Sequence, residues 1–169
     1  MIREGLDCIL RAGELSDSPL IKRRLALLDR GTFASPDYLN RFGTPRTPDD
    51  LGGHEMVGFL SPDTGDTVPL VFGADGKARQ VMLPAVVTVT SPETNVACAC
   101  TGLGLIQVPR YRVSSELASG ALVEVLAGFP PSPLPVHALY SHTRQLSPRL
   151  RVFIDWMAEQ FRDRLSPTE

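Results

Sequence analysis

The stretch that decides the fold is LPAVVTVTSPETNVACACTGLGLIQVP, residues 83–109. It contains a β-branched run, Val86–Thr90, which favours a strand. Ser91 and Pro92 then predict a helix start, because serine caps helices and proline is favoured at the first helical position. A second apolar run, Leu105–Val108, follows. Strand, helix and strand at this spacing predict a βαβ unit with parallel strands and a right-handed crossover.

The helix start in such a unit lies beside the carboxyl end of the first strand, where ligands bind in open α/β sheets. Thr90, Ser91 and Thr94 supply hydroxyls at this point, and free N–H groups with the helix dipole suit an anion. Glu93 opposes a strongly anionic ligand unless its side chain points away. The same residues also make an ordinary helix cap, so the sequence leaves a cap and a ligand site equally open.

Composition and charge exclude several classes of protein. The chain has 169 residues, 43% hydrophobic and 21% charged, which is typical of a globular protein of one domain or two small lobes. A formal net charge of −2 gives no reason to expect direct nucleic-acid binding. No apolar run approaches the length of a membrane span, and residues 1–5 show no signal-peptide pattern. Three cysteines do not form a disulfide framework, so we expect a cytoplasmic location.

Motifs for metal, cofactor or nucleophilic chemistry are weak. Cys98 and Cys100 lie two apart on a predicted helix, point in different directions, and are better explained as small buried side chains. The glycines of Gly102–Gly104 end a helix and open a strand, the reverse of a dinucleotide-binding loop. No nucleophile is paired with a base, so we expect no cofactor, no metal and no enzymatic activity. The three histidines, expected at the surface or locally bonded, are His54, His137 and His142.

The remaining pattern predicts two lobes. One lobe is continuous over residues 29–130, and the other is partial and assembled from residues 1–28 and 131–169. The chain crosses between them near residues 25–32 and returns through the proline-rich stretch 127–137. Two crossings predict a hinge and a cleft, a usual place for a small-molecule site.

Several elements of these lobes are predicted individually. We expect a strand over 6–10 with a loop over 11–14, a helix over 110–119 and a strand over 121–126. The last helix is capped by Ser147 and carries an apolar stripe that should pack on a sheet. The stripe consists of Leu150, Phe153, Ile154, Met157, Phe161 and Leu165.

Five blocks of the chain resemble the effector-binding domain of LysR-type transcriptional regulators. The blocks at 33–59 and 139–161 are specific in spacing and residue type, and the five together cover most of the chain. They are REGLDCILRAGEL (3–15), FASPDYLNRFGTPRTPDDLGGHEMVGF (33–59), ACTGLGLIQVP (99–109), LASGALVEVL (117–126) and LYSHTRQLSPRLRVFIDWMAEQF (139–161).

The resemblance implies an α/β fold like that of type 2 periplasmic-binding proteins, with two Rossmann-like lobes joined by two crossovers. It implies a small-molecule effector in the cleft, a homo-oligomer, and DNA contact only through a winged helix-turn-helix that this sequence does not show. It also implies that the opening elements of the first lobe are missing, so we expect that lobe to be incomplete. The effector-binding residues that the resemblance implies are Arg11, Gly13, Thr90, Ser91, Thr94, Pro109 and Arg110.

These observations favour an effector-sensing domain of a LysR-type regulator, with a carboxylate or an aromatic compound as effector. A truncated oligomerisation module without ligand binding and a periplasmic solute-binding protein stay open as alternatives. The missing signal-peptide pattern speaks against the second of these.

Overall fold

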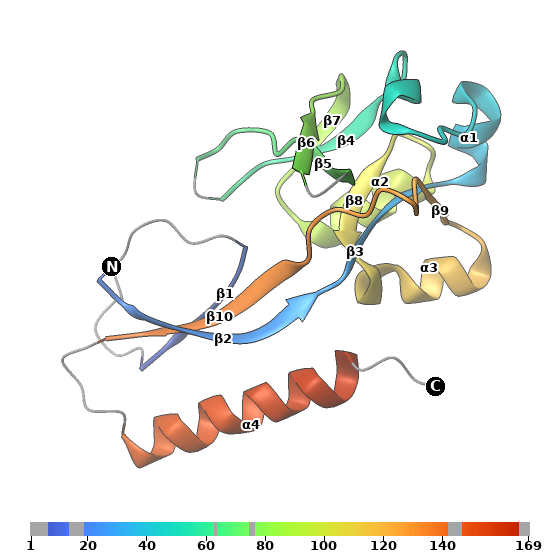
Figure 1. Ribbon diagram of the computed structural model, residues 1–169. Coiled ribbons are helices and arrows are strands. Elements are labelled where there is room, and N and C mark those ends of the chain that lie inside the picture. The colour runs from blue at the N-terminus through green and yellow to red at the C-terminus, as the bar shows by residue number, and fades with distance from the viewer. Residues whose placement is uncertain (1–6, 14–18, 63, 75–76, 142–146, 166–169) are drawn as a thin grey trace. The chain divides into compact units, whose positions relative to one another are not determined.

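The computed structural model describes residues 7–13, 19–62, 64–74, 77–141 and 147–165. The chain divides into two compact units, each with its own packing. Unit 1 comprises residues 1–28 and 133–169, and unit 2 comprises residues 29–132 (Figure 1).

The sheet of unit 2 is built around the predicted βαβ stretch. β3 pairs antiparallel with β8 and with β9, while β4 pairs parallel with β7. A parallel bridge between Met56 and Leu105 joins these two groups, with Leu105 N–H donating to the Glu55 carbonyl at 3.0 Å. β7 and β8 are therefore both parallel to β4, which lies between them. The strands are β3 (Arg30–Ala34), β4 (Met56–Phe59), β7 (Ala85–Val89), β8 (Ile106–Pro109) and β9 (Val123–Val125).

Short helices and a hairpin complete unit 2, and α2 begins where the sequence predicts. Proline follows the N-cap residue in three of them, at Ser35, Thr47 and Ser91. The predicted helix over 110–119 is instead a 3₁₀ turn followed by an α-helix, and the strand predicted over 121–126 spans only β9. The elements are α1 (Pro36–Phe42), η1 (Pro48–Leu51), β5 (Leu70–Ala74), β6 (Lys77–Val81), α2 (Pro92–Cys100), η2 (Arg110–Val113) and α3 (Ser114–Ser119).

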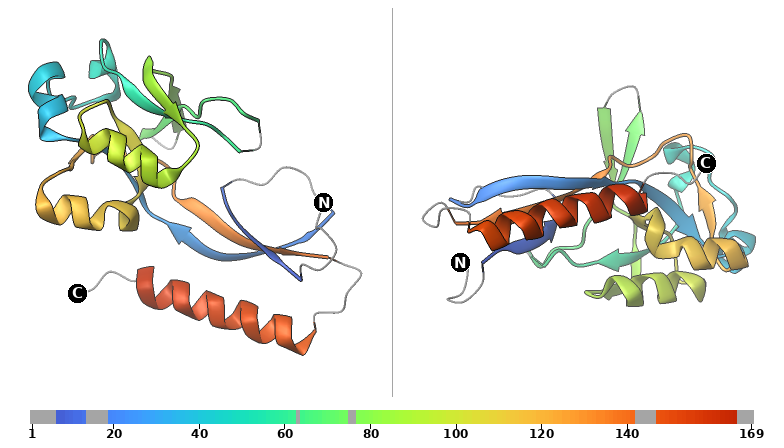
Figure 2. Two further views of the ribbon diagram at one scale, coloured as in Figure 1. Left: turned by 180° about the vertical axis from the view of Figure 1, so that it is seen from behind. Right: turned by 90° about the horizontal axis from the view of Figure 1, so that it is seen from below.

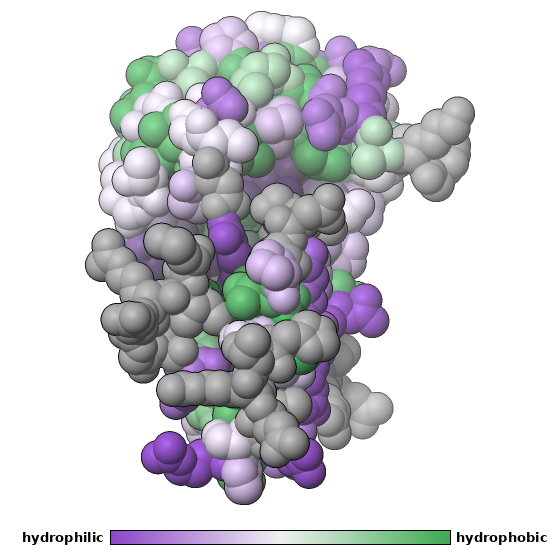
Figure 3. Space-filling view, turned by 90° about the vertical axis from the view of Figure 1, so that its left-hand side faces the viewer, coloured by the Kyte–Doolittle hydropathy of each residue, from purple (hydrophilic) through white to green (hydrophobic). Residues whose placement is uncertain are grey.

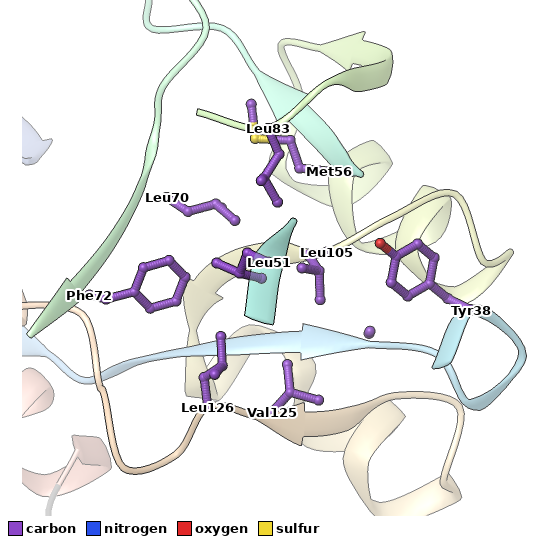
Figure 4. Packing of buried hydrophobic residues seen from close by; sticks show 10 residues of the cluster. Tyr38, Leu51, Met56, Leu70, Phe72, Leu83, Leu105, Val125 and Leu126 are labelled. Carbon is purple, nitrogen blue, oxygen red and sulfur yellow. The ribbon is translucent and has the colours of Figure 1, made fainter. Parts of the chain in front are cut away.

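Two hydrophobic clusters hold unit 2 together. The larger one gathers residues from β3, α1, η1, β4, β5, β9 and the loops beside them, with Leu51 and Leu105 near its middle (Figure 4). The second packs α2 against the sheet through Val96 and Ala99, which contact a cluster that includes Phe33 and Ile106. Burial of these apolar side chains supplies the main driving force for folding of the unit.

Unit 1 is a three-stranded antiparallel sheet with one long helix. Its strand order is β1 (Ile9–Ala12), β10 (Leu134–Tyr140), β2 (Ile21–Leu28). α4 (Pro148–Leu165) runs alongside this sheet (Figures 1 and 2) and packs on it through Leu150 and Ile154.

Two predictions for unit 1 are wrong in detail. The first strand continues to Ala12, so Arg11 lies in β1 rather than in a loop; Leu6 and Glu14 fall outside the described residues. Leu150 and Ile154 of the predicted stripe do pack on the sheet, but Phe153 of the same stripe is 40% exposed, because α4 turns its Ile154 side toward the sheet. Phe153 therefore belongs to a second apolar face of α4. Elsewhere on the surface, hydrophilic residues and small hydrophobic patches lie side by side, as on the face in Figure 3.

Candidate functional site

The turn from β7 into α2 is a well-formed helix start. The Ser91 hydroxyl accepts a hydrogen bond from the Thr94 N–H at 3.3 Å, and the Ser91 carbonyl accepts one from the Asn95 N–H at 3.0 Å. The buried Asn95 side chain donates to the Val57 carbonyl at 3.3 Å, which ties the first turn of α2 to β4. The predicted cap is therefore confirmed, and the turn is fixed at the carboxyl end of β7.

In this turn the threonine side chains are exposed, whereas the Glu93 carboxylate is bound by neighbouring side chains. Thr90 and Thr94 are exposed, whereas Ser91 is half-buried. The Ser91 hydroxyl donates to Glu93 at 2.8 Å, and Arg112 binds the other Glu93 oxygen at 2.9 Å. The Ser91 hydrogen bond, with help from Arg112, lowers the pKa of Glu93. Glu93 is thus held by its neighbours, and the threonine hydroxyls can donate to and accept from a ligand.

The end of β8 contributes a buried proline and a paired arginine. Pro109 is buried and lies opposite Arg30 in the β3–β8 ladder. The Arg110 N–H donates to the Asp29 carbonyl at 2.9 Å, and its guanidinium binds both oxygens of Glu124, one of them at 2.5 Å. The hydrogen bonds to Glu124 raise the pKa of Arg110. An anionic ligand at Arg110 would therefore compete with Glu124.

Arg11 and Gly13 lie in unit 1. Arg11 is half-buried in β1, in register with His137 of β10, and takes part in at least one polar interaction. Gly13 follows the strand with φ +110°, and its N–H donates to the Pro135 carbonyl at 2.9 Å. A side chain at this position would be strained, so glycine is needed for the backbone to leave β1 here.

The side chain of Gln107 in β8 links β3 and β5 by hydrogen bonds. This role was not predicted from the sequence. Its side-chain oxygen accepts from the Val71 N–H at 2.8 Å and from the Arg30 guanidinium at 3.2 Å. Its amide nitrogen donates to the Val71 carbonyl at 2.8 Å and to the Thr32 hydroxyl at 3.0 Å. Burial lowers the pKa of Arg30. A lone amide inside the apolar run LIQV was the signal that could have revealed this network.

Packing and local hydrogen bonds account for His54 and for the two cysteines Cys98 and Cys100. His54 is buried and its Nδ1 lies 3.0 Å from the Tyr38 hydroxyl, while Cys98 and Cys100 are half-buried against the α2 cluster. Burial lowers the pKa of His54. Within the part of the chain that the structure describes, no group of three metal-ligating side chains occurs. His142 lies outside the described residues.

Comparison with known proteins decides the family. The family model of the LysR substrate binding domain matches residues 1–162. The chain belongs to the LysR substrate-binding domain family. HTH-type transcriptional regulator YhjC of Escherichia coli is 37% identical to this LysR domain over 160 residues, which are 94% of the chain and 53% of the relative. HTH-type transcriptional regulator CrgA of Neisseria meningitidis is 31% identical over 98% of the chain and 54% of the relative. The chain thus spans about half the length of the curated relatives it matches.

Solved structures agree with the family assignment. The regulatory domain of CrgA superposes with a TM-score of 0.72 and 32% identity, covering 92% of this chain and 76% of that domain. The effector domain of AmpR from Pseudomonas aeruginosa, at 20% identity and a TM-score of 0.70, shows the shared fold. This LysR domain is therefore an effector-binding regulatory domain with the α/β fold of type 2 periplasmic-binding proteins. Among its described residues, none of the helices is long and apolar enough to span a membrane.

Proposed function

We propose that this domain binds a small carboxylate or aromatic effector, and that Thr90, Ser91 and Thr94 form part of the binding surface. The observation that carries the proposal is the β7–α2 turn. It presents two exposed threonine hydroxyls and the N-terminus of α2 at the carboxyl end of a parallel strand. Strand ends of this kind are where α/β sheets bind ligands. Arg11, Gly13, Pro109 and Arg110 are proposed as further contacts.

The proposed role is regulatory rather than enzymatic. YhjC and CrgA are both named as HTH-type transcriptional regulators, which supports a non-enzymatic sensor that acts in the cytoplasm as part of a homo-oligomeric regulator. An effector that binds one conformation more tightly shifts the population toward it. In a whole regulator, that shift would change the placement of its DNA-binding domains. We also propose residues 29–130 as one lobe, and residues 1–28 with 131–169 as the other.

A thermal-shift screen tests the binding proposal. The chain is heated with about 10 mM of each member of a panel of small carboxylates and aromatics, including benzoate and succinate. A ligand present at about 100 times its dissociation constant adds about 2.7 kcal/mol of stability, which raises Tm by about 5 °C or more. We expect at least one member to do so.

Matched variants locate the site. Thr90→Val removes one exposed hydroxyl, keeps the shape of the side chain and leaves the Ser91 cap in place. We expect it to lose most of the ligand-induced shift, because the hydroxyl is a ligand partner. Thr44→Val, at an exposed threonine in the loop after α1, is the control and should keep the full shift. A panel that raises Tm of the two variants equally, or shifts nothing, would refute the proposal.

A further inference from the structure

The guanidinium of Arg110 is held in the geometry by which proteins recognise a carboxylate. Its Nη1 and Nη2 atoms each donate to one oxygen of Glu124, and the distance from Nη2 to Oε1 is 2.5 Å. Two such bonds match the planar fork of an arginine to a planar carboxylate, so they fix both its position and its orientation. A carboxylate site is therefore already formed at Arg110, and a carboxylate of the same chain fills it.

The pair reaches across β3, and a glycine in that strand makes room for it. Arg110 directly follows β8 and Glu124 lies in β9, while β3 runs between these two strands. Gly31 of β3 is buried, and a Cβ added there would lie 3.1 Å from Oε1 of Glu124 and 2.6 Å from the ring of Phe33. The missing side chain at Gly31 thus leaves the space in which the Glu124 carboxylate meets Arg110.

Both partners of the pair are open to solvent, and the sheet does not depend on them. The side chain of Arg110 is 42% exposed and that of Glu124 is 23% exposed. Ion pairs with this degree of exposure contribute little net stability. β8 and β9 are each tied to β3 by their own ladder of backbone hydrogen bonds. Arg110 can therefore change its carboxylate partner without unfolding the sheet.

Arg110 lies at the same edge of the sheet as the β7–α2 turn. Thr90 directly follows β7, just as Arg110 directly follows β8. Both strands run parallel to β4, which lies between them, so their ends are two strand spacings, or about 10 Å, apart. Arg112 binds Glu93 of α2 at 2.9 Å, so the segment after β8 contacts the start of α2. A ligand with its carboxylate at Arg110 thus has the hydroxyls of the turn across the end of β4.

We propose that Glu124 is an internal competitor at Arg110, and that the effector is a carboxylate which takes its place. The inference rests on the proposed effector site and names the chemical class of its ligand. Because Glu124 is tethered beside Arg110, its carboxylate is present at a high effective concentration, and an effector has to displace it. A neutral compound of the same shape gains nothing at this arginine. Glu124 therefore sets both the affinity of the site and its preference for acids.

Replacement of Glu124 by glutamine tests the competition. The amide keeps the shape of the side chain but removes its charge, so it binds Arg110 less strongly than the carboxylate does. We expect benzoate or succinate to bind Glu124→Gln at least about tenfold more tightly than wild type, and the neutral amides benzamide and succinamide to change by less than about threefold. Isothermal titration calorimetry of the whole chain measures these dissociation constants.

Two further variants locate the effect. Asp49→Asn removes the carboxylate of the Asp49–Arg79 pair elsewhere in unit 2, so it is the matched control and should leave the dissociation constants unchanged. The double variant Glu124→Gln with Arg110→Gln lacks the guanidinium as well and should lose the gain in carboxylate affinity. Circular dichroism checks that each variant is folded. The wild-type chain supplies a test without substitution, because the Arg110 Nε–H resonance should shift on addition of the acid that binds and not of its amide.

The outcomes separate this inference from the proposed function. An acid that binds wild type and Glu124→Gln equally well would overturn the inference and leave the proposed function standing. An acid that binds only Glu124→Gln would support the competition and count against effector binding by the wild-type chain. Benzoate and succinate that bind neither protein would overturn the inference, and so would an amide that gains as much affinity as its acid.

Discussion

Replacement of Gln107 by leucine is the sharpest structural test of how unit 2 is assembled. The amide of Gln107 makes four hydrogen bonds, two to the backbone of Val71 and one each to Thr32 and Arg30. Leucine has nearly the same size but can make none of them. The change therefore removes the polar link between β5 and the β3–β8 pair and leaves the packing volume almost unaltered.

The size of the effect follows from what is left unpaired. Thr32 is 1% exposed and has no access to water, and Arg30 is a half-buried cation that loses one acceptor. Each buried polar group without a partner costs about 1–3 kcal/mol, and the added apolar surface of leucine offsets part of that. We expect Gln107→Leu to lower the free energy of unfolding of unit 2 by about 2–4 kcal/mol.

Two measurements check this value. Urea unfolding followed by far-UV circular dichroism gives the change in stability, and hydrogen–deuterium exchange of β5 peptides reports protection of the Val71 N–H. Gln80→Leu, at an exposed glutamine of β6, is the matched control and should change stability by less than about 0.5 kcal/mol. A Gln107→Leu protein as stable as the control, with β5 still protected, would refute the reasoning.

Three further outcomes follow from the same structure. Tyr38→Phe keeps the ring but removes the hydroxyl that accepts from the Glu55 N–H at 2.8 Å, so urea unfolding should show a loss of about 1–3 kcal/mol, against less than about 0.5 for the exposed Tyr111→Phe. Burial lowers the pKa of His54 below its ordinary value of 6.5, so as pH falls the unfolded chain takes up a proton at this histidine before the folded chain does. The free energy of unfolding should therefore fall as pH drops below about 6.5. The urea midpoint of His54→Gln should lack this contribution to the pH dependence. Gly104 has φ +150°, and an added Cβ would lie 2.7 Å from the backbone of β4, so Gly104→Ala should lower Tm by many degrees, whereas Gly52→Ala, with open space around it, should not.

Local signals in the sequence predicted the helix starts well. Ser91 and Ser147 each precede a proline, and a helix begins at each of these prolines. Gly102 and Gly104 were also predicted correctly as the end of α2 and the entry into β8, because both need positive φ. Signals of this kind depend on neighbouring residues only, so they can be read without knowing the rest of the fold.

Features that depend on distant residues could not be predicted. β4 lies between β7 and β8. The two pairings that place it there join segments about thirty residues apart (β4 with β7) and about fifty residues apart (Met56 with Leu105), beyond the reach of local pattern. The Glu124 partner of Arg110 was missed for the same reason, although it decides how that arginine can meet an anion. Phe153 was misplaced because apolar periodicity in α4 fits two faces, and only packing against the sheet selects Ile154.

The most direct test of the central claim is a titration of the ¹⁵N-labelled chain with a panel member that stabilises it. We predict that the largest chemical-shift changes fall on the amides of residues 90–95, at the β7–α2 turn, and that Thr90→Val abolishes them while Thr44→Val preserves them. Binding that leaves these amides unchanged and perturbs another region would contradict the account.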